Sequence, residues 1–232
     1  MKKTKTVKKT PAVTKKPAPA AEQTLVVFLL DRTGSMENVR QETISGFNTY
    51  RTDLLKKPDS KHITFYFAQF DTQSLDVIHD CIPLADVVPL SMDTYIPRAM
   101  TPLYDSIGKT IRAIEEKAKG SKVLFVTLTD GNENASREWT SASIKTLIKH
   151  KEDADKWTFA YIGVGQEAWA QNEQLAAGTQ GASNVLRATR GANTQAAYGH
   201  MAKATMMRTS TKGGQCISAC FAGVQLDQED EH

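Results

Sequence analysis

The sequence has few cysteines and no long apolar run, and both absences narrow its function classes. Three cysteines among 232 residues cannot form a complete disulfide framework, and Cys216 and Cys220 lack the paired ligands of a zinc site. We therefore expect reduced, mostly structural thiols. No stretch approaches the roughly 18 apolar residues that span a membrane, and the lysines at the start precede no apolar segment typical of a secretory signal. We expect a soluble, cytoplasmic protein without membrane contact.

Several common catalytic patterns are also missing. The sequence contains no GxSxG, P-loop or HExxH pattern. Its five histidines are scattered without metal-ligand spacing, which favours structural or surface roles. The glycines Gly163 and Gly165 in "GVG" lack the third glycine of a dinucleotide loop, because Ala168 stands in its place. A tight turn from strand to helix is the simpler interpretation.

Charge divides the chain into three parts. Residues 1–23 carry seven lysines and one glutamate, so the rest of this chain of net charge +3 is mildly acidic. We predict a disordered Lys/Pro/Ala-rich basic arm over 1–23, one domain over 24–224 and an acidic tail over 225–232. The arm has no aromatic residues among its lysines, so a nucleic-acid-associated scaffold is the less favoured of its roles.

The apolar pattern from residue 24 onward predicts an α/β fold. Short apolar runs alternate with longer helix-like segments, which is typical of an open, mostly parallel, Rossmann-like sheet with helices on both faces. The two runs at 62–71 and 74–84 are close enough for a hairpin, which adds one antiparallel edge strand. Further strands are predicted over 25–31, 123–130 and 157–165, and helices over 36–56, 103–119, 140–152, 166–177 and 193–212.

Oxygen-bearing side chains follow two of these strands and precede one helix. Asp31, Thr33 and Ser35 lie in "DRTGSM", Thr101 in "AMTPLYDS" and Asp130 in "LTDGNEN". Because the carboxyl ends of parallel strands meet at one edge of the sheet, we expect these segments to converge there. Two carboxylates and three hydroxyls form a ligand set that suits Mg²⁺, Mn²⁺ or Ca²⁺ and disfavours zinc or copper.

These three segments resemble the metal-binding elements of von Willebrand factor type A (vWA) domains. "DRTGSM" is similar to their DxSxS element, "TPLYDS" to the loop that carries their metal-binding threonine, and "TDGNEN" to their TDG element. The resemblance, to vWA proteins of bacterial or phage type, implies a metal-ion-dependent adhesion site (MIDAS). It also implies a non-enzymatic protein-interaction function, in which an Asp or Glu of a partner protein completes the metal shell. Thr33 stands where the family more often has serine.

Family members in bacteria and their viruses often act beside ATPases, kinases or phosphatases, so the resemblance allows a partner of that kind. Four residues near the metal are candidates for orienting the partner by proximity in sequence only: Tyr104, Asn132, Glu133 and Asn134. Far from the site, Met201, Met206 and Met207 have helical spacing and are interpreted as one packing stripe.

Two other interpretations of the same aspartates remain. "DRTG" also resembles the motif of haloacid-dehalogenase-type phosphotransferases, in which Asp31 would be a nucleophile beside Mg²⁺. Thr33 cannot serve as the second acid of those soluble phosphatases, and "TDGNEN" departs from their later GDGxND motif. In the structural interpretation, Asp31 or Thr33 caps a helix and Asp130 is a turn residue. One metal site explains the three segments better than separate caps.

Overall fold

The computed structural model describes residues 22–154, 156–180, 184–189 and 192–210. The predicted basic arm up to residue 21, the acidic tail and the cysteines Cys216 and Cys220 lie outside these ranges. The division of the chain into arm, domain and tail therefore stays a prediction.

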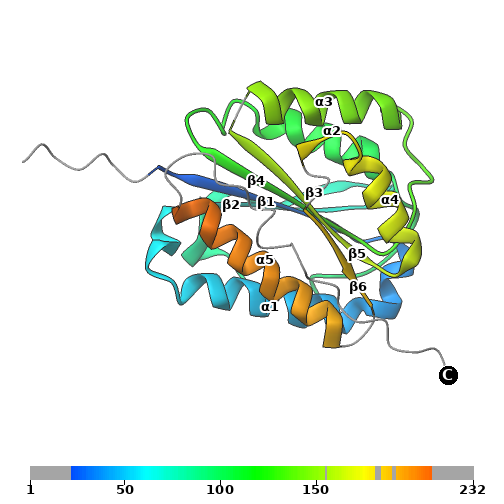
Figure 1. The fold of residues 1–232 in the computed structure, drawn as a ribbon. Helices are drawn as coiled ribbons and strands as arrows, with labels where there is room; N and C mark the ends of the chain where they lie inside the picture. The colour runs from blue at the N-terminus through cyan, green and yellow to red at the C-terminus, as the bar shows by residue number, and fades with distance from the viewer. Residues whose placement is uncertain (1–21, 155, 181–183, 190–191, 211–232) are drawn as a thin grey trace, which may run out of the picture.

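In the described residues, six strands form one sheet in the order β3-β2-β1-β4-β5-β6 (Figure 1). All neighbouring strands are parallel except β2 and β3, which pair antiparallel, so β3 is the predicted antiparallel edge strand. The predicted α/β class and sheet type are confirmed. The strands are β1 (Thr24–Asp31), β2 (Ile63–Phe70), β3 (Leu75–Pro83), β4 (Lys122–Thr129), β5 (Trp157–Val164) and β6 (Val185–Ala188).

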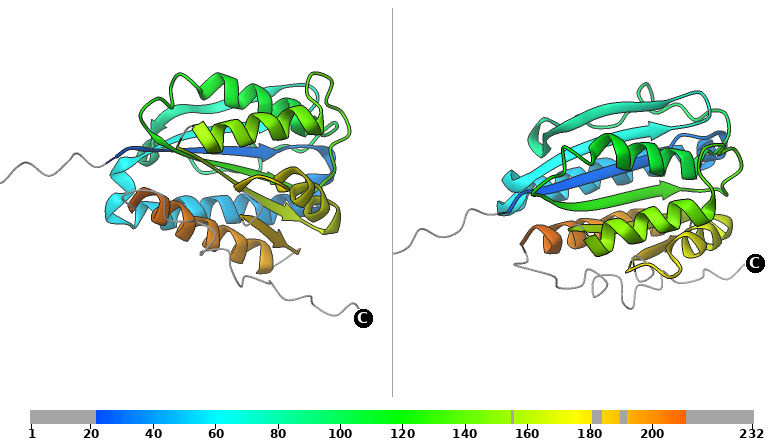
Figure 2. Two further views of the ribbon diagram at one scale, coloured as in Figure 1. Left: turned by 45° about the horizontal axis from the view of Figure 1, so that its top comes forward. Right: turned by 90° about the horizontal axis from the view of Figure 1, so that it is seen from above.

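Helices cover both faces of this sheet (Figures 1 and 2). Alternate residues of β1 face opposite ways, as the pleat of a strand requires. Phe28 packs with α1 and α5 in one apolar cluster, and Leu29 packs with α2 and α3 in the other. The helices are α1 (Arg40–Leu55), α2 (Leu103–Ile114), α3 (Ser141–Ala154), α4 (Gln166–Ala176) and α5 (Ala192–Ser210). Within the described residues, no helix is long and apolar enough to cross a membrane.

Strand register places the two predicted aspartates at the same edge of the sheet. Asp31, the last residue of β1, pairs with Phe70 at the end of β2, and Leu30 pairs with Leu128 of β4. Asp130 follows β4 directly and therefore lies beside the end of β1. Every residue of β1 and β4 is buried, which explains their near-continuous apolar sequences.

Three expectations about elements need correction. The strand β6 was not predicted, because its four residues are too few to show a period. The segment Gly34–Val39 is a 3₁₀ helix, η1, so α1 begins at Arg40 rather than at 36. The methionines do not form one buried stripe: Met201 is buried, Met206 is partly buried and Met207 is exposed.

Candidate metal centre

Asp31 is the last residue of β1, and hydrogen bonds from neighbouring groups fix its side chain. Its carboxylate is fully buried. The backbone N–H of Thr33 donates to Oδ1 at 2.7 Å, and the Thr129 hydroxyl donates to Oδ2 at 2.6 Å. The Tyr95 hydroxyl donates to the Asp31 carbonyl oxygen at 2.6 Å. These bonds fix the carboxylate and the turn that follows it.

Burial raises the pKa of Asp31 to about 7, because removing a carboxylate from water disfavours its charged form. Hydrogen bonds from Thr129 and Thr33 act in the opposite direction, whereas the negative charge of Asp130 raises the pKa further. The protein thus brings the buried carboxylate of Asp31 close to the half-buried carboxylate of Asp130. A cation there would favour the ionised form of both.

The hydroxyl of Ser35 joins the first segment to the third. It donates to Asp130 Oδ1 at 2.7 Å and lies 3.3 Å from the Thr33 hydroxyl. Ser35 is exposed and Asp130 is half-buried, whereas Thr33 is buried. Oxygens from the end of β1 and the end of β4 therefore meet at the sheet edge, with an open side toward solvent.

Thr101 reaches the same place from the start of α2. An atom at the Cβ position of Gly131 would lie 3.6 Å from the Ser35 hydroxyl and 4.0 Å from the Thr101 hydroxyl. The hydroxyls of Ser35 and Thr101 therefore both lie beside Gly131, and we call their surroundings the Gly131 space. The structure brings all five predicted residues together.

The chemistry of this space suits a hard divalent cation. The five predicted residues supply two carboxylates and three hydroxyls, which are oxygen ligands only. Within the described residues, no three His, Cys, Asp or Glu side chains gather in a cluster that could hold a metal, so the candidate depends on its hydroxyls. Whether the five residues bind a metal stays a prediction.

The side chain of Thr33 does not cap the helix that follows it. Thr33 occupies the N-cap position of η1, but its side chain makes no capping hydrogen bond there. Its hydroxyl instead lies beside that of Ser35. The structural interpretation of Thr33 as a helix cap is therefore not supported by the geometry.

The loop after Asp130 is fixed by hydrogen bonds to Thr101 and to the start of α2, and a role of its residues in orienting a partner stays a prediction. The Asn134 side-chain oxygen accepts from the Thr101 backbone N–H at 2.9 Å, and the Asn134 N–H donates to the Thr101 carbonyl at 3.1 Å. The Glu133 carboxylate accepts from the backbone N–H groups of Tyr104, Ala135 and Ser136. Both side chains hold the loop in place, and Asn134 is at the same time exposed to solvent. Tyr104 is also largely buried.

A charged cluster beside the centre was not found from the sequence. Asp71 follows β2 and accepts from Arg32 Nε at 3.1 Å and Arg98 Nε at 2.8 Å. Burial by itself raises the pKa of Asp71, but the Arg98 hydrogen bond, two backbone N–H donors and the charge of Arg32 hold it below its usual range. An available signal was that the apolar run of β2, like that of β1, leads directly into an aspartate.

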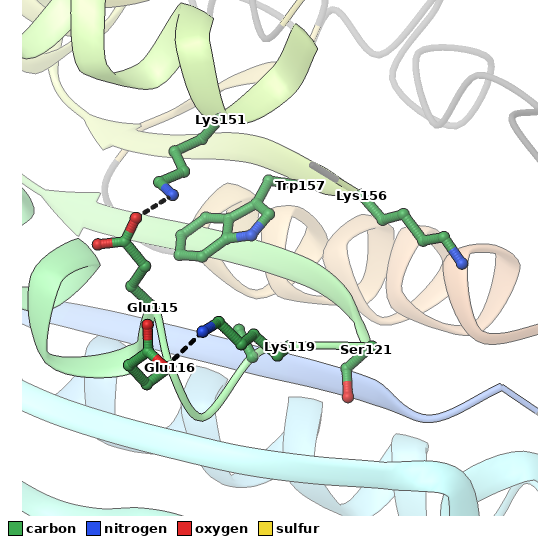
Figure 3. Close-up of a pocket in the computed structure, with 9 residues that line it drawn as sticks. Glu115, Glu116, Lys119, Ser121, Lys151, Lys156 and Trp157 are labelled. Carbon is green, nitrogen blue, oxygen red and sulfur yellow. Dashed lines mark hydrogen bonds and ion pairs between the residues drawn. The ribbon is translucent and has the colours of Figure 1, made fainter. Parts of the chain in front are cut away.

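Another hollow, of about 350 Å³, lies at the opposite edge of the sheet (Figure 3). It is lined by residues at the amino ends of β4 and β5 and the loop after α2. Lys151 bonds Glu115 at 2.5 Å and lies 5.5 Å from the Trp157 ring, and Lys119 bonds Glu116 at 2.5 Å. Its charges are matched within the protein, so it is a weaker candidate than the metal centre.

No protein-family model and no curated protein matches this sequence, but solved structures resemble its fold. The pilus adhesin SpaC of Lactobacillus rhamnosus GG has a TM-score of 0.64 at 11% identity, covering 82% of this chain and 31% of that one. The SpRpn10 vWA domain has a TM-score of 0.51 at 11% identity, with coverages of 78% and 95%.

The manganese-loaded TRAP protein of Plasmodium vivax has a TM-score of 0.51 at 15% identity, with coverages of 73% and 69%. This chain spans less than a third of the adhesin. At such low identities the similarity concerns the fold alone. Within the described residues, the protein has the Rossmann-like α/β fold of vWA domains.

Proposed function

We propose that the protein is a divalent-cation-dependent protein-interaction module. In this proposal, a cation bound at the sheet edge accepts a carboxylate from an Asp or Glu of a partner protein. The residues that would hold the cation are Asp31, Thr33, Ser35, Thr101 and Asp130. The bound cation would supply a positive, incompletely coordinated centre for an anionic oxygen.

The observation that carries this proposal is the meeting of three distant segments around the Gly131 space. The hydrogen bond between Ser35 and Asp130 joins residues 95 positions apart, and Thr101 approaches the same space from α2. Caps and turns satisfy only their own segment, so they do not require such a meeting. A ligand bound by all three segments would require them to meet.

Mg²⁺ is the proposed cation, with Mn²⁺ and Ca²⁺ as alternatives. An all-oxygen set with only two carboxylates suits Mg²⁺, which keeps several of its waters when it binds. The manganese-loaded state of the TRAP structure supports a divalent cation in this fold. The sequence resemblance to a MIDAS points the same way, and it also allows an ATPase, kinase or phosphatase complex as the partner.

The proposed role is non-enzymatic. A phosphotransferase would need Asp31 as a nucleophile with an accessible oxygen. Both oxygens of Asp31 instead accept hydrogen bonds, and the residue is fully buried. These bonds fix the carboxylate in place, and Thr33, two residues on, cannot serve as the acid that such an enzyme requires.

The test is affinity purification of the full chain in millimolar Mg²⁺ and in EDTA, followed by mass spectrometry. We expect a protein partner that is retained with Mg²⁺ and lost in EDTA and in Ser35→Ala. Ser35 is exposed, so its substitution spares the core better than a change at Asp31. Ser143→Ala, at an exposed site on α3, is the matched control. Partner retention that ignores both EDTA and Ser35→Ala would refute the proposal.

A further inference from the structure

A cleft of about 670 Å³ adjoins the candidate metal centre. It is lined on one side by the turn at 71–75 between β2 and β3, and on the other by the loop at 134–138. Met100 and Pro102, the two neighbours of Thr101 in the sequence, also line this cleft, and α2 contributes Lys109. We call this hollow the rim cleft. A partner residue beside the one that reaches the metal would enter it.

The carboxylate on the first wall is already satisfied. Asp71 has a fully buried side chain that forms ion pairs with Arg32 and Arg98 at 2.9 and 2.8 Å. Its second oxygen accepts from the backbone N–H groups of Gln73 and Ser74 at 2.6 and 3.0 Å. The two arginines therefore balance the negative charge of Asp71, so an occupant of the cleft would not meet this charge alone.

The carboxylate on the second wall is satisfied in a different way. Asp105 accepts from three successive backbone N–H groups, those of Arg137, Glu138 and Trp139, at 2.9 to 3.0 Å. Burial alone raises the pKa of Asp105, but these donors, together with Lys109, hold it below its usual range. This carboxylate shapes the loop and has little capacity left for an occupant.

Three charged side chains then remain to face the cleft. Lys109 and Glu138 form an ion pair at 2.8 Å, but both are about half exposed, so water and salt weaken this pair. The Arg137 side chain is exposed and lines the cleft, and within the described residues its guanidinium has no hydrogen-bond or ion-pair partner. The cleft thus offers one guanidinium without an ion-pair partner among the described residues, and the planar fork of this group suits a carboxylate.

We infer that the rim cleft is a second acidic-residue site, so that the partner segment carries two acidic side chains. One reaches the metal, and the other pairs with Arg137 in the cleft. This inference rests on the proposed function, because the metal fixes the first acidic residue beside Thr101. The occupant is a protein segment, since the cleft continues the metal rim at both neighbours of Thr101.

The test is fluorescence anisotropy of the full chain in millimolar Mg²⁺ with labelled synthetic peptides. One peptide has a single Asp in a Gly/Ser background, and a series adds a Glu at successive spacings on either side. We expect the best two-acid peptide to bind roughly fivefold more tightly than the one-acid peptide at low salt, with less gain at high salt.

Variants of the protein test which residue causes the tighter binding of the two-acid peptide. Arg137→Gln should remove it while leaving the one-acid peptide unchanged, and Glu138→Gln should enlarge it, because this substitution frees Lys109. Arg112→Gln, which removes a guanidinium stacked on Trp139 elsewhere on α2, should keep the gain. Equal binding of both kinds of peptide, or an equal loss for both in Arg137→Gln, overturns the inference alone. Binding that ignores EDTA, or no binding of either kind, overturns the proposed function as well.

Discussion

At the scale of single residues, three aspartates close three neighbouring strands and do different work. Asp31 is buried among hydrogen-bond donors at the end of β1. Asp130 accepts from Ser35 at the solvent side of the same centre. Asp71 joins two arginines to the turn before β3. Asp31 and Asp130 belong to the candidate site. Asp71 supports the loop after β1 through its contact with Arg32.

Replacement of Asp71 by asparagine should destabilise the protein. Arg32 would lose its buried partner but keep the half-exposed Asp76, so we expect a loss of about 2 kcal/mol in the free energy of unfolding at neutral pH. The pKa of Asp71 lies below its usual range, so the stabilisation is present above about pH 4 and is lost as pH falls through the folded pKa. Urea unfolding of Asp71→Asn and wild type at several pH values measures this gap.

The difference in the free energy of unfolding between Asp71→Asn and wild type should become smaller toward acidic pH. Asp53→Asn, which removes a surface ion pair with Lys56, is the control and should cost less than about 1 kcal/mol. A gap for Asp71→Asn that stays constant down to strongly acidic pH would show that the ionised carboxylate is not what stabilises the turn.

Asn134 positions Thr101 and should influence the metal. Asn134→Ala removes the acceptor of the Thr101 N–H, so we expect about fivefold weaker Mg²⁺ binding by calorimetry, with an unfolding cost near 1 kcal/mol. Asn134→Asp keeps an acceptor and should keep the affinity. Asn132→Ala, at the exposed neighbour, is the control. Equal affinities for Asn134→Ala and wild type would separate Asn134 from the site.

At the scale of elements, α1 and α5 pack closely because one residue has no side chain. A Cβ atom on Gly46 of α1 would lie 2.2 Å from the ring of Tyr198 on α5. Gly46→Ala should therefore push the helices apart and cost about 2 kcal/mol in the free energy of unfolding. Gly199→Ala, one residue from Tyr198 with open space around it, should instead stabilise by about 0.5 kcal/mol. Thermal melts that rank the two alike would contradict this packing.

The elements also show which features could be predicted from sequence. Long apolar runs and the motifs at their ends predicted five strands and the convergence of the five site residues, because parallel strands share an edge. The short strand β6 and the clamp between Asn134 and Thr101 could not be predicted. Both depend on contacts between distant residues, such as the pairing of β6 with β5, that no local period records.

At the scale of the whole molecule, the candidate centre connects three segments, of which the first and the last are 95 positions apart in the chain. Ser35 follows β1, Thr101 precedes α2 and Asp130 follows β4. A ligand bound by all these segments would have to be released before the segments could separate on unfolding. Ligand binding and global stability are therefore linked.

Mg²⁺ should accordingly raise the melting temperature of the full chain. At a hundredfold excess over the dissociation constant, a ligand specific for the folded state adds about 2.7 kcal/mol. For a domain of this size, that corresponds to roughly 5 to 10 °C. We expect the shift in MgCl₂, its reversal by EDTA, and its loss in Ser35→Ala, because the variant lacks one oxygen of the centre. NaCl at matched ionic strength controls for screening, and an undiminished Mg²⁺ shift in Ser35→Ala would place the stabilising ion elsewhere.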